Sequence, residues 1–432
     1  MRPSRCNWSN GSFRLSKRRQ AESAGRSRAP RPRFKSRLSI YASERRPGAD
    51  MRYKIAALGT ALIAAFVLAA CKPGGADQGP VIKIGSAAPL TGEIAHLGKD
   101  NENGARMAVD DINAAGGVKL GDKTYRLELV GEDDKADPRE GTLAAQKLVD
   151  EGVVAVIGHL NSGTSIPASR IYADANVVQI SPSATNPKYT LQGFRTTYRV
   201  VANDNQQGAV LANFAASEMK AKRVAIVDDR TQYGQGLADV FERVAKDKGV
   251  DVIDREFTTN RATDFNAILT KIRSMKPDVV MFGGMDSVAA PMARQMKELG
   301  MKATMLAGDG VCDPGFISIA GDASGVLTCS VAGRALEKMA KGDEFTKRYK
   351  QKFGIDCQRY SPYSYDAVFA IVDALKRAGR PDRLALVDAM SKTSFEGLTG
   401  HIEFDEHGDL KNGEISVYDV RDGKLNLLAS FH

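Results

Sequence analysis

The sequence lacks the motifs that mark common enzyme classes and metal centres. The first β-rich run, 81–85, is not followed by the Gly-x-Gly-x-x-Gly turn of dinucleotide-binding enzymes, and the chain has no Gly-x-Ser-x-Gly nucleophile elbow. Histidine is scarce, at 5 residues in 432, and no Cys-x-x-Cys or His-rich cluster indicates a zinc site. We therefore expect a protein that is not an enzyme, with no cofactor and no metal.

The chain also lacks a basic character outside its beginning, although its formal net charge is +9. Residues 1–50 contribute +11, and Arg52 and Lys54 add +2, which leaves −4 for residues 71–432. A nucleic-acid partner is therefore not expected. Residues 1–50 are rich in Arg and Ser and poor in apolar residues, so we expect a disordered basic arm. The alternative is an upstream start codon chosen in error, with Met51 as the true start.

Residues 51–70 have the pattern of an export signal. The cationic start Met51-Arg-Tyr-Lys is followed by an uncharged run, 55–70, that is shorter than the roughly 20 residues a membrane span needs. The run ends in Leu68-Ala-Ala-Cys71, which resembles the lipobox of bacterial lipoproteins. This predicts a periplasmic or envelope protein that is lipid-anchored at Cys71, with residues 71–80 as a tether. The alternative is an ordinary signal peptide with an incidental cysteine.

Cysteine is sparse in the rest of the chain. Cys312 and Cys329 flank a loop of 16 residues, and an exported protein is in a compartment that permits disulfides. We therefore predict a Cys312–Cys329 disulfide. Cys357 is left without a predicted partner.

Strand-like and helix-like segments alternate after residue 80, in two successive runs. Val153–Ile157, for example, is a continuous apolar run, as expected of a buried parallel strand, and Pro138 opens a helical segment that Gly152 ends. Repeated βα units of this kind predict an α/β fold with two doubly wound parallel-sheet lobes joined by a multi-strand hinge. We assign residues 81–202 and 331–411 to lobe 1, and residues 203–330 and 412–432 to lobe 2.

Ligands of open α/β sheets bind beyond the carboxyl ends of the strands, close to helix N-termini. Turns rich in small and hydroxyl residues follow two predicted strands, at Ser162 and at 181–185, and can bind a carboxylate. Tyr233 and Asp309 follow two other strands and offer an aromatic ring and an acid for an ammonium group. Together these groups complement a zwitterionic amino acid. Taken singly, each has a structural alternative as a helix cap, a turn or a packing residue.

Several of these segments resemble a known family. They include "IKIGSAAPLTG" (82–92), "VAVIGHLNSGTSIPAS" (154–169), "QISPSATNP" (179–187), "VAIVDDRTQYGQGLADV" (224–240) and "DEHGDLK" (405–411). The chain from about residue 81 to 428 is similar to the periplasmic leucine/isoleucine/valine-binding proteins, which have the type I periplasmic binding protein fold.

The resemblance implies a role for each candidate residue. Ser162 aligns with the serine that binds the ligand α-carboxylate, and Thr185 with a threonine that holds the ligand head group. Ser183 replaces a residue that binds through its backbone, and Tyr233 aligns with the tyrosine contributed by the second lobe. Asp309 stands where the family has a glutamate that pairs with the α-ammonium. The implied ligand-binding residues are Ser162, Ser183, Ala184, Thr185, Tyr233, Asp309, Met285 and Leu97.

Two of these positions depart from the family pattern. Leu97 and Met285 replace tyrosines, which makes the side-chain pocket more apolar and more adaptable. His159 and the pair Asp133-Asp134 also lie near the predicted site. We interpret His159 as a structural residue and the aspartate pair as part of a solvated loop.

The implied function is the solute-binding component of an ABC importer. It would capture an amino acid, branched-chain or aliphatic, between the lobes and deliver it to a permease of the inner membrane. One alternative is the same fold binding another small ligand, such as an amide or an aromatic acid. A second alternative is a ligand-sensing module.

Overall fold

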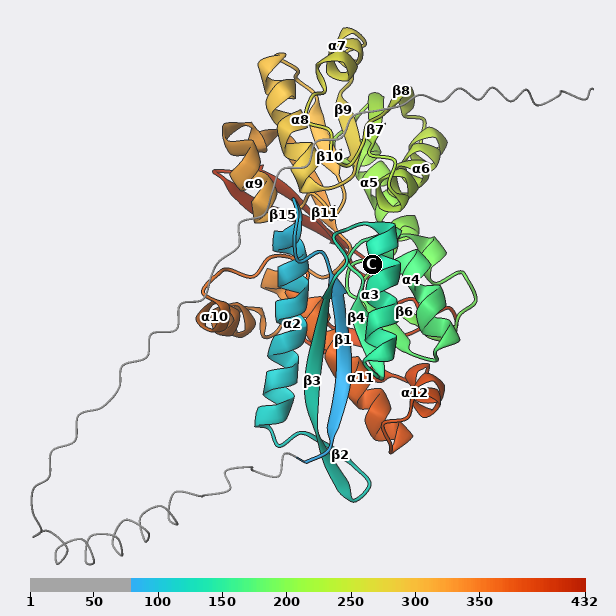
Figure 1. Ribbon diagram of the computed structural model, residues 1–432. Helices are drawn as coiled ribbons and strands as arrows, with labels where there is room; N and C mark the ends of the chain where they lie inside the picture. Colours follow the sequence, from blue (N-terminus) through green and yellow to red (C-terminus); the bar gives the residue numbers. More distant parts are fainter. Residues whose placement is uncertain (1–78) are drawn as a thin grey trace, which may run out of the picture. The chain divides into compact units, whose positions relative to one another are not determined.

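The computed structural model describes residues 79–432 (Figure 1). The predicted basic arm, the export signal, the lipidation site Cys71 and most of the tether therefore lie outside the described residues. Within 79–432, no helix has both the length and the apolar character needed to cross a membrane.

The first sheet within the described residues has six strands, and all its neighbouring strands pair in parallel except β2 with β3. Its long apolar runs are buried on both faces, as predicted for 153–157. In spatial order the strands are β2 (Val118–Leu120), β3 (Lys123–Asp133), β1 (Val81–Ala88), β4 (Ala155–Gly158), β5 (Val178–Ser181) and β6 (Thr197–Arg199).

The second sheet has seven strands, of which β14 and β15 are antiparallel to their neighbours and the others are parallel. In spatial order the strands are β15 (Lys424–Phe431), β14 (Ile415–Arg421), β11 (Leu327–Val331), β10 (Thr304–Ala307), β9 (Val279–Gly283), β7 (Arg223–Asp228) and β8 (Asp251–Phe257). A small antiparallel pair joins β12 (Ser394–Glu396) to β13 (His401–Glu403).

Helices cover both faces of each sheet. In Figure 1, α2 (Ala95–Ala114) lies on one side of β1 and β3, and α3 (Pro138–Asp150) with α4 (Ser162–Asp174) on the other. We call the six-stranded sheet and its helices lobe 1, and the seven-stranded sheet and its helices lobe 2. Lobe 1 also contains η1 (Pro187–Tyr189), η3 (Leu336–Lys338), α10 (Gly342–Phe353), α11 (Ser361–Ala378) and α12 (Arg383–Met390). Lobe 2 contains α5 (Asp204–Ser217), α6 (Gln232–Asp247), α7 (Asn266–Ser274), α8 (Asp286–Glu298), α9 (Pro314–Ala320) and η2 (Gly321–Val326).

Local sequence explains where several helices begin. Asp137 caps α3, since its carboxylate accepts hydrogen bonds from the N–H groups of Arg139 and Glu140. Pro138 is the first residue of the helix, where a backbone N–H would have no partner within the helix, and proline has no N–H. Asn203 forms a capping box with Gln206 at the start of α5. Gly104 allows α2 to approach α11, because a Cβ there would lie 2.1 Å from the carbonyl oxygen of Ser361.

Two large apolar cores correspond to the two sheets. One contains residues of β1, β4, β5, α2, α11 and α12, and the other contains residues of β7, β9, β10, α7, α8 and α9. The α/β class with two mainly parallel sheets is as predicted. The exact residues at which one lobe passes into the other stay a prediction. The sequence reading missed α9, β6 and β15, which are short or lack a clear apolar period.

Candidate functional site

The predicted site residues follow the carboxyl ends of parallel strands. Ser162 is the first residue of α4 after β4, and 183–185 follow β5. In lobe 2, Tyr233 lies in the first turn of α6 after β7, and Asp309 lies two residues after β10. Parallel strands direct these four segments to the same edge of their own sheets.

Asp309 is a buried carboxylate held by hydroxyl groups from both lobes. Its Oδ1 accepts a hydrogen bond from the hydroxyl of Tyr233 at 3.1 Å, and its Oδ2 accepts one from the hydroxyl of Tyr360 at 2.9 Å. Tyr360 precedes α11 of lobe 1. Burial raises the pKa of Asp309, and the two hydroxyls partly offset this increase. A cation bound beside Asp309 would favour its charged form.

A second buried acid, Asp204, was not predicted. It is the first residue of α5, and neither of its carboxylate oxygens has a hydrogen-bond partner among the described residues. Burial raises its pKa to about 8, and the charge of Asp309 adds to this increase. The hydroxyl of Thr185 opposes the increase, although the two groups are not aligned as a hydrogen bond. Asp204 thus lies close to Thr185 of lobe 1 and to Asp309 of lobe 2, which were both predicted as site residues.

The side-chain amide of Gln207, one turn further along α5, is also buried without a partner among the described residues. A Cβ built on Gly308 would lie 3.3 Å from its Oε1 and 2.5 Å from the hydroxyl of Tyr233. Buried polar groups without partners are rare, and they often mark a place that a ligand or a water fills. The lobe 2 side of the site therefore offers the unpartnered oxygens of Asp204 together with both polar atoms of Gln207.

The lobe 1 side of the site is built from backbone turns and hydroxyl groups. Oγ of Ser162 accepts a hydrogen bond from the N–H of Asn186 at 3.2 Å, and Oγ of Ser183 donates to the carbonyl of Leu160 at 3.0 Å. Ala184 is buried, and its N–H donates to Oγ of Ser181 at 2.8 Å. The hydroxyl of Thr185 is buried and has no partner among the described residues. These contacts fix the turn and leave Thr185 free to bind.

Apolar side chains from both lobes form a shared cluster beside these polar groups. Leu97 and Leu160 come from lobe 1, and Tyr233 and Met285 come from lobe 2. All four are buried. The two positions that depart from the family pattern therefore lie in one apolar region with the predicted tyrosine.

The two lobes are in contact around the site. The side-chain amide of Asn186 donates to the carbonyl oxygen of Gln232 at 2.6 Å, which joins lobe 1 to α6. Ser183, Asp309 and Tyr360 line one small cavity, of about 10 Å³. A cavity of this size holds at most about one water molecule. This cavity is therefore too small for a molecule larger than water.

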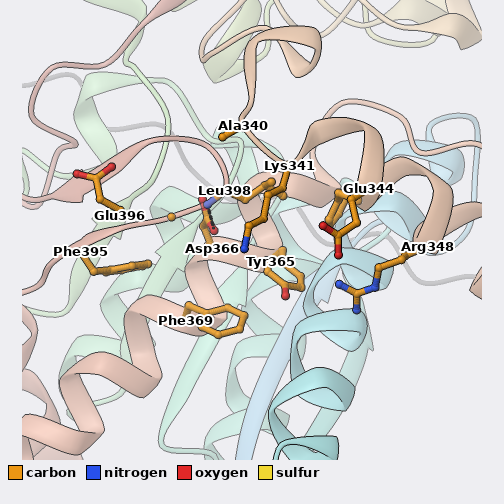
Figure 2. Close-up of a pocket in the computed structure, with 12 residues that line it drawn as sticks. Ala340, Lys341, Glu344, Arg348, Tyr365, Asp366, Phe369, Phe395, Glu396 and Leu398 are labelled. Atoms are coloured by element: carbon orange, nitrogen blue, oxygen red, sulfur yellow. Dashed lines mark hydrogen bonds between the residues drawn. The ribbon is translucent and has the colours of Figure 1, made fainter.

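A larger cavity, of about 490 Å³, lies elsewhere (Figure 2). Figure 2 shows Phe369 and Phe395 on one side of it, and Lys341, Glu344 and Arg348 on another. It shares no lining residue with the predicted ligand site. Its aromatic and charged walls come from lobe 1: Lys341 caps α10, and the other aromatic and charged lining residues lie in α10, α11 and β12.

The cysteines, His159 and the aspartate pair were also the subject of sequence predictions. The Cys312–Cys329 disulfide is present, and Cys357 is unpaired within 79–432. His159 is fully buried, with Nδ1 2.7 Å from Oδ2 of Asp134 and Nε2 3.1 Å from the hydroxyl of Tyr172, which agrees with a structural role. The interpretation of Asp133-Asp134 as part of a solvated loop is wrong for Asp134, which is fully buried and contacts His159, 25 residues further along the chain.

Comparison with known proteins identifies relatives over most of the chain. A family model described as periplasmic binding protein matches residues 81–424. The leucine-, isoleucine-, valine-, threonine-, and alanine-binding protein of Pseudomonas aeruginosa is 36% identical over 338 residues, which cover 78% of this chain and 89% of that protein. The Leu/Ile/Val-binding protein homolog 1 of Brucella abortus is 35% identical, with 85% and 98% covered.

Solved structures have the same fold. The leucine binding protein LivK of Thermotoga maritima superposes with a TM-score of 0.75 at 32% identity, covering 81% of this chain and 98% of that one. The family consists of binding proteins of transporters and not of enzymes. The predicted fold, family and absence of catalysis are thus confirmed: the chain belongs to the periplasmic binding protein family.

Proposed function

We propose that the protein captures an amino acid with an aliphatic side chain between its two lobes and delivers it to the permease of an ABC importer. The relatives named above are described as binding leucine, isoleucine and valine, and the Pseudomonas protein is described as binding threonine and alanine as well. The site of this chain supports a ligand of that class at three places: an acidic end, a hydroxyl-rich end and an apolar wall.

The acidic end carries the proposal. Asp309 and Asp204 are both buried in lobe 2, and their charges interact unfavourably, which the buried guanidinium of Arg199 only partly offsets for Asp204. Two neighbouring buried carboxylates are costly unless a positive charge joins them. The α-ammonium of an amino acid supplies that charge and can donate hydrogen bonds to both acids.

The hydroxyl-rich end complements the ligand carboxylate. Ser162 stands at the N-terminus of α4, where the helix dipole and the free N–H groups favour a negative charge. The unpartnered hydroxyl of Thr185 can donate to the same carboxylate or accept from the ammonium. Ser183 and Ala184 hold the turn that carries Thr185.

The apolar wall selects the side chain. Leu97 and Met285 sit in a cluster that both lobes share, so a ligand side chain placed there is removed from water on closure. Methionine adapts its shape more readily than tyrosine, so this wall can fit side chains of different branching. This favours leucine, isoleucine or valine over a polar amino acid.

Capture requires a hinge motion. The ligand first binds lobe 1, and lobe 2 then closes over it with Tyr233 and Asp309. The contacts that cross between the lobes, such as Asn186 to Gln232, belong to the closed form. Closure excludes water and strengthens the charged contacts. The closed form is the one that the permease recognises.

We further propose that the protein is exported and lipid-anchored at Cys71, so that residues 71–80 tether the two lobes to the membrane that holds the permease. Labelling with a radioactive fatty acid in cells tests this step. Label in the wild-type protein and none in Cys71→Ser is the expected result, and equal labelling of both would overturn it.

Calorimetry of the purified protein with leucine, isoleucine, valine, urea and benzoate tests the ligand class. Aliphatic amino acids are expected to bind, because only they offer both an ammonium for the two acids and an apolar side chain. Binding of benzoate or urea without binding of any amino acid would contradict the proposal. Solution scattering with saturating leucine is expected to show a more compact particle than without leucine.

A further inference from the structure

Three polar side chains that are not part of the proposed amino-acid site meet beside it, where the two lobes touch. His96 lies in the first turn of α2, Asp286 is the first residue of α8, and Asp313 caps α9. Nε2 of His96 lies 2.9 Å from Oδ2 of Asp286 and 3.7 Å from Oδ1 of Asp313. The three donor atoms all lie within 4.8 Å of one another. One lobe thus supplies an imidazole and the other supplies two carboxylates.

The two carboxylates are buried and poorly satisfied. The side chains of Asp286 and Asp313 are 0% and 1% exposed. Neither oxygen of Asp286 has a hydrogen-bond partner among the described residues, and Oδ2 of Asp313 has none either. Oδ1 of Asp313 accepts from the N–H groups of Gly315 and Phe316. Among the described residues, the cationic side chain paired with these two buried carboxylates is His96.

One imidazole supplies at most one positive charge to these two acids. Asp286 and Asp313 together can carry two negative charges next to this one imidazole. A divalent cation would neutralise both carboxylates, which a single proton on His96 does not.

Two of the three separations between the donor atoms are compatible with such a cation. Zinc bonds to imidazole nitrogen and carboxylate oxygen are about 2.0–2.2 Å long, so donors in a tetrahedral site lie about 3.3 Å apart. The two separations from His96, 2.9 and 3.7 Å, lie on either side of this value.

Gly315 packs directly against the three donor atoms. A Cβ built on Gly315 would lie 2.6 Å from Oδ1 of Asp313, 2.7 Å from Nε2 of His96 and 3.0 Å from Oδ2 of Asp286. Glycine at this position therefore lets the three donor atoms come together. The side chain of His96 is 29% exposed, which gives a cation and a fourth, water ligand a path from solvent.

We propose that His96, Asp286 and Asp313 form a binding site for a divalent cation of the zinc type, which links the two lobes in the closed form. Imidazole and carboxylate ligands suit zinc and its neighbours in the first transition series. Because the ligands come from both lobes, the complete site exists only when the lobes are together. Cation and amino acid therefore strengthen each other's binding by the same factor.

The test begins with zinc binding in the absence of any amino acid. A chelator first removes metal from the full chain, which is then titrated with zinc chloride by calorimetry. Cobalt serves as a second probe, because its absorption spectrum depends on its ligands. The wild-type protein is expected to bind one zinc that His96→Ala binds at least about 100-fold more weakly, since loss of an outer-shell partner alone costs 10–100-fold. Asp286→Asn is expected to behave in the same way.

His401→Ala is the matched control. Nδ1 of His401 lies 2.7 Å from Glu396, and Nε2 lies 3.6 Å from Glu403, but this cluster is exposed and lies within lobe 1. The zinc site is expected to survive in His401→Ala. Absence of zinc binding in the wild-type protein, or equal zinc affinity in wild-type and His96→Ala, would overturn the proposal and leave the cluster as an ion pair.

The link to closure has its own readout. Zinc is expected to raise the leucine affinity of the wild-type protein and to leave that of His96→Ala unchanged, whereas a chelator removes the difference. Retained leucine binding by His96→Ala also shows that this variant is folded. If the protein binds zinc through His96 but binds no amino acid, the cation site stands and the proposed amino-acid function fails, so the two proposals are tested separately.

Discussion

The hydroxyl of Tyr360 donates a 2.9 Å hydrogen bond to Oδ2 of Asp309, and this bond joins lobe 1 to lobe 2 at the proposed ligand site. The other oxygen of the same carboxylate is bound by Tyr233 of lobe 2. Asp309 is therefore fixed in place by both lobes when they are together. Tyr233 belongs to the same lobe as Asp309 and can hold the carboxylate before closure, and Tyr360 adds its bond when the lobes meet.

Replacing Asp309 with Asn is expected to weaken leucine binding by roughly 2–5 kcal/mol, because the ammonium would be buried without its charged partner. Calorimetry on wild-type and variant protein measures the difference. Asp322→Asn changes an exposed acid on lobe 2 and is the control. Unchanged leucine affinity in Asp309→Asn would remove the assignment of Asp309 to the ammonium.

Leucine affinity should depend on pH through Asp204. Burial raises the pKa of Asp204 to about 8, and an ammonium beside it would lower this pKa. The complex then holds fewer protons than the free protein, so leucine binding releases a proton and its affinity rises with pH up to about 8. Calorimetry in two buffers of different ionisation enthalpy measures the released proton. The proton release should disappear in Asp204→Asn, and a pH-independent wild-type affinity would contradict this account.

Ser162→Ala is expected to weaken leucine binding by about 1.5–3 kcal/mol, as for a hydrogen bond to a charged group. The analogue leucinamide, which has no carboxylate, separates this contact from a general loss of structure. The wild-type protein should bind leucinamide more weakly than leucine, and Ser162→Ala should weaken leucinamide binding much less than leucine binding. Equal losses for both ligands would show that Ser162 does not act on the carboxylate.

The Cys312–Cys329 disulfide should stabilise the fold. The two cysteines are 17 residues apart, and closing a loop of this length contributes about 3 kcal/mol in the chain-entropy model. The double variant Cys312→Ala/Cys329→Ala is expected to lose about that amount of unfolding free energy in urea denaturation. Cys357→Ala removes an unpaired thiol and is the comparison. Equal stability of the double variant and the wild type would refute this estimate.

Much of the fold could be predicted from the sequence because the strands are short apolar runs set between amphipathic helices. The apolar run 153–157 and the helical segment that begins at Pro138 and ends before Gly152 show the pattern clearly. The positions of Ser162, Thr185, Tyr233 and Asp309 followed from the rule that ligands bind beyond strand ends. The segments α9 and β15 could not be predicted, because their apolar residues do not follow the regular spacing of a helix or a strand.

Other parts of the site depend on contacts between distant segments. An aspartate at the start of a helix, such as Asp204, is typical of the favourable interaction with the helix dipole, so nothing local marked it as a site residue. Tyr360 reaches Asp309 only because α11 returns to lobe 1 after the chain has passed through lobe 2. His96, Asp286 and Asp313 come from three helices that are far apart in the sequence, and no motif links them. Only the structure shows that residues of this kind lie together.

The most direct test of the account compares leucine with 4-methylpentanoate, which has the same side chain and carboxylate but no amine. The two buried acids require the ammonium, so leucine is expected to bind at least about 100-fold more tightly, in line with the cost of leaving buried polar groups unpaired. Equal affinity for the two ligands, or tighter binding of 4-methylpentanoate, would contradict the claim that Asp309 and Asp204 recognise an amine.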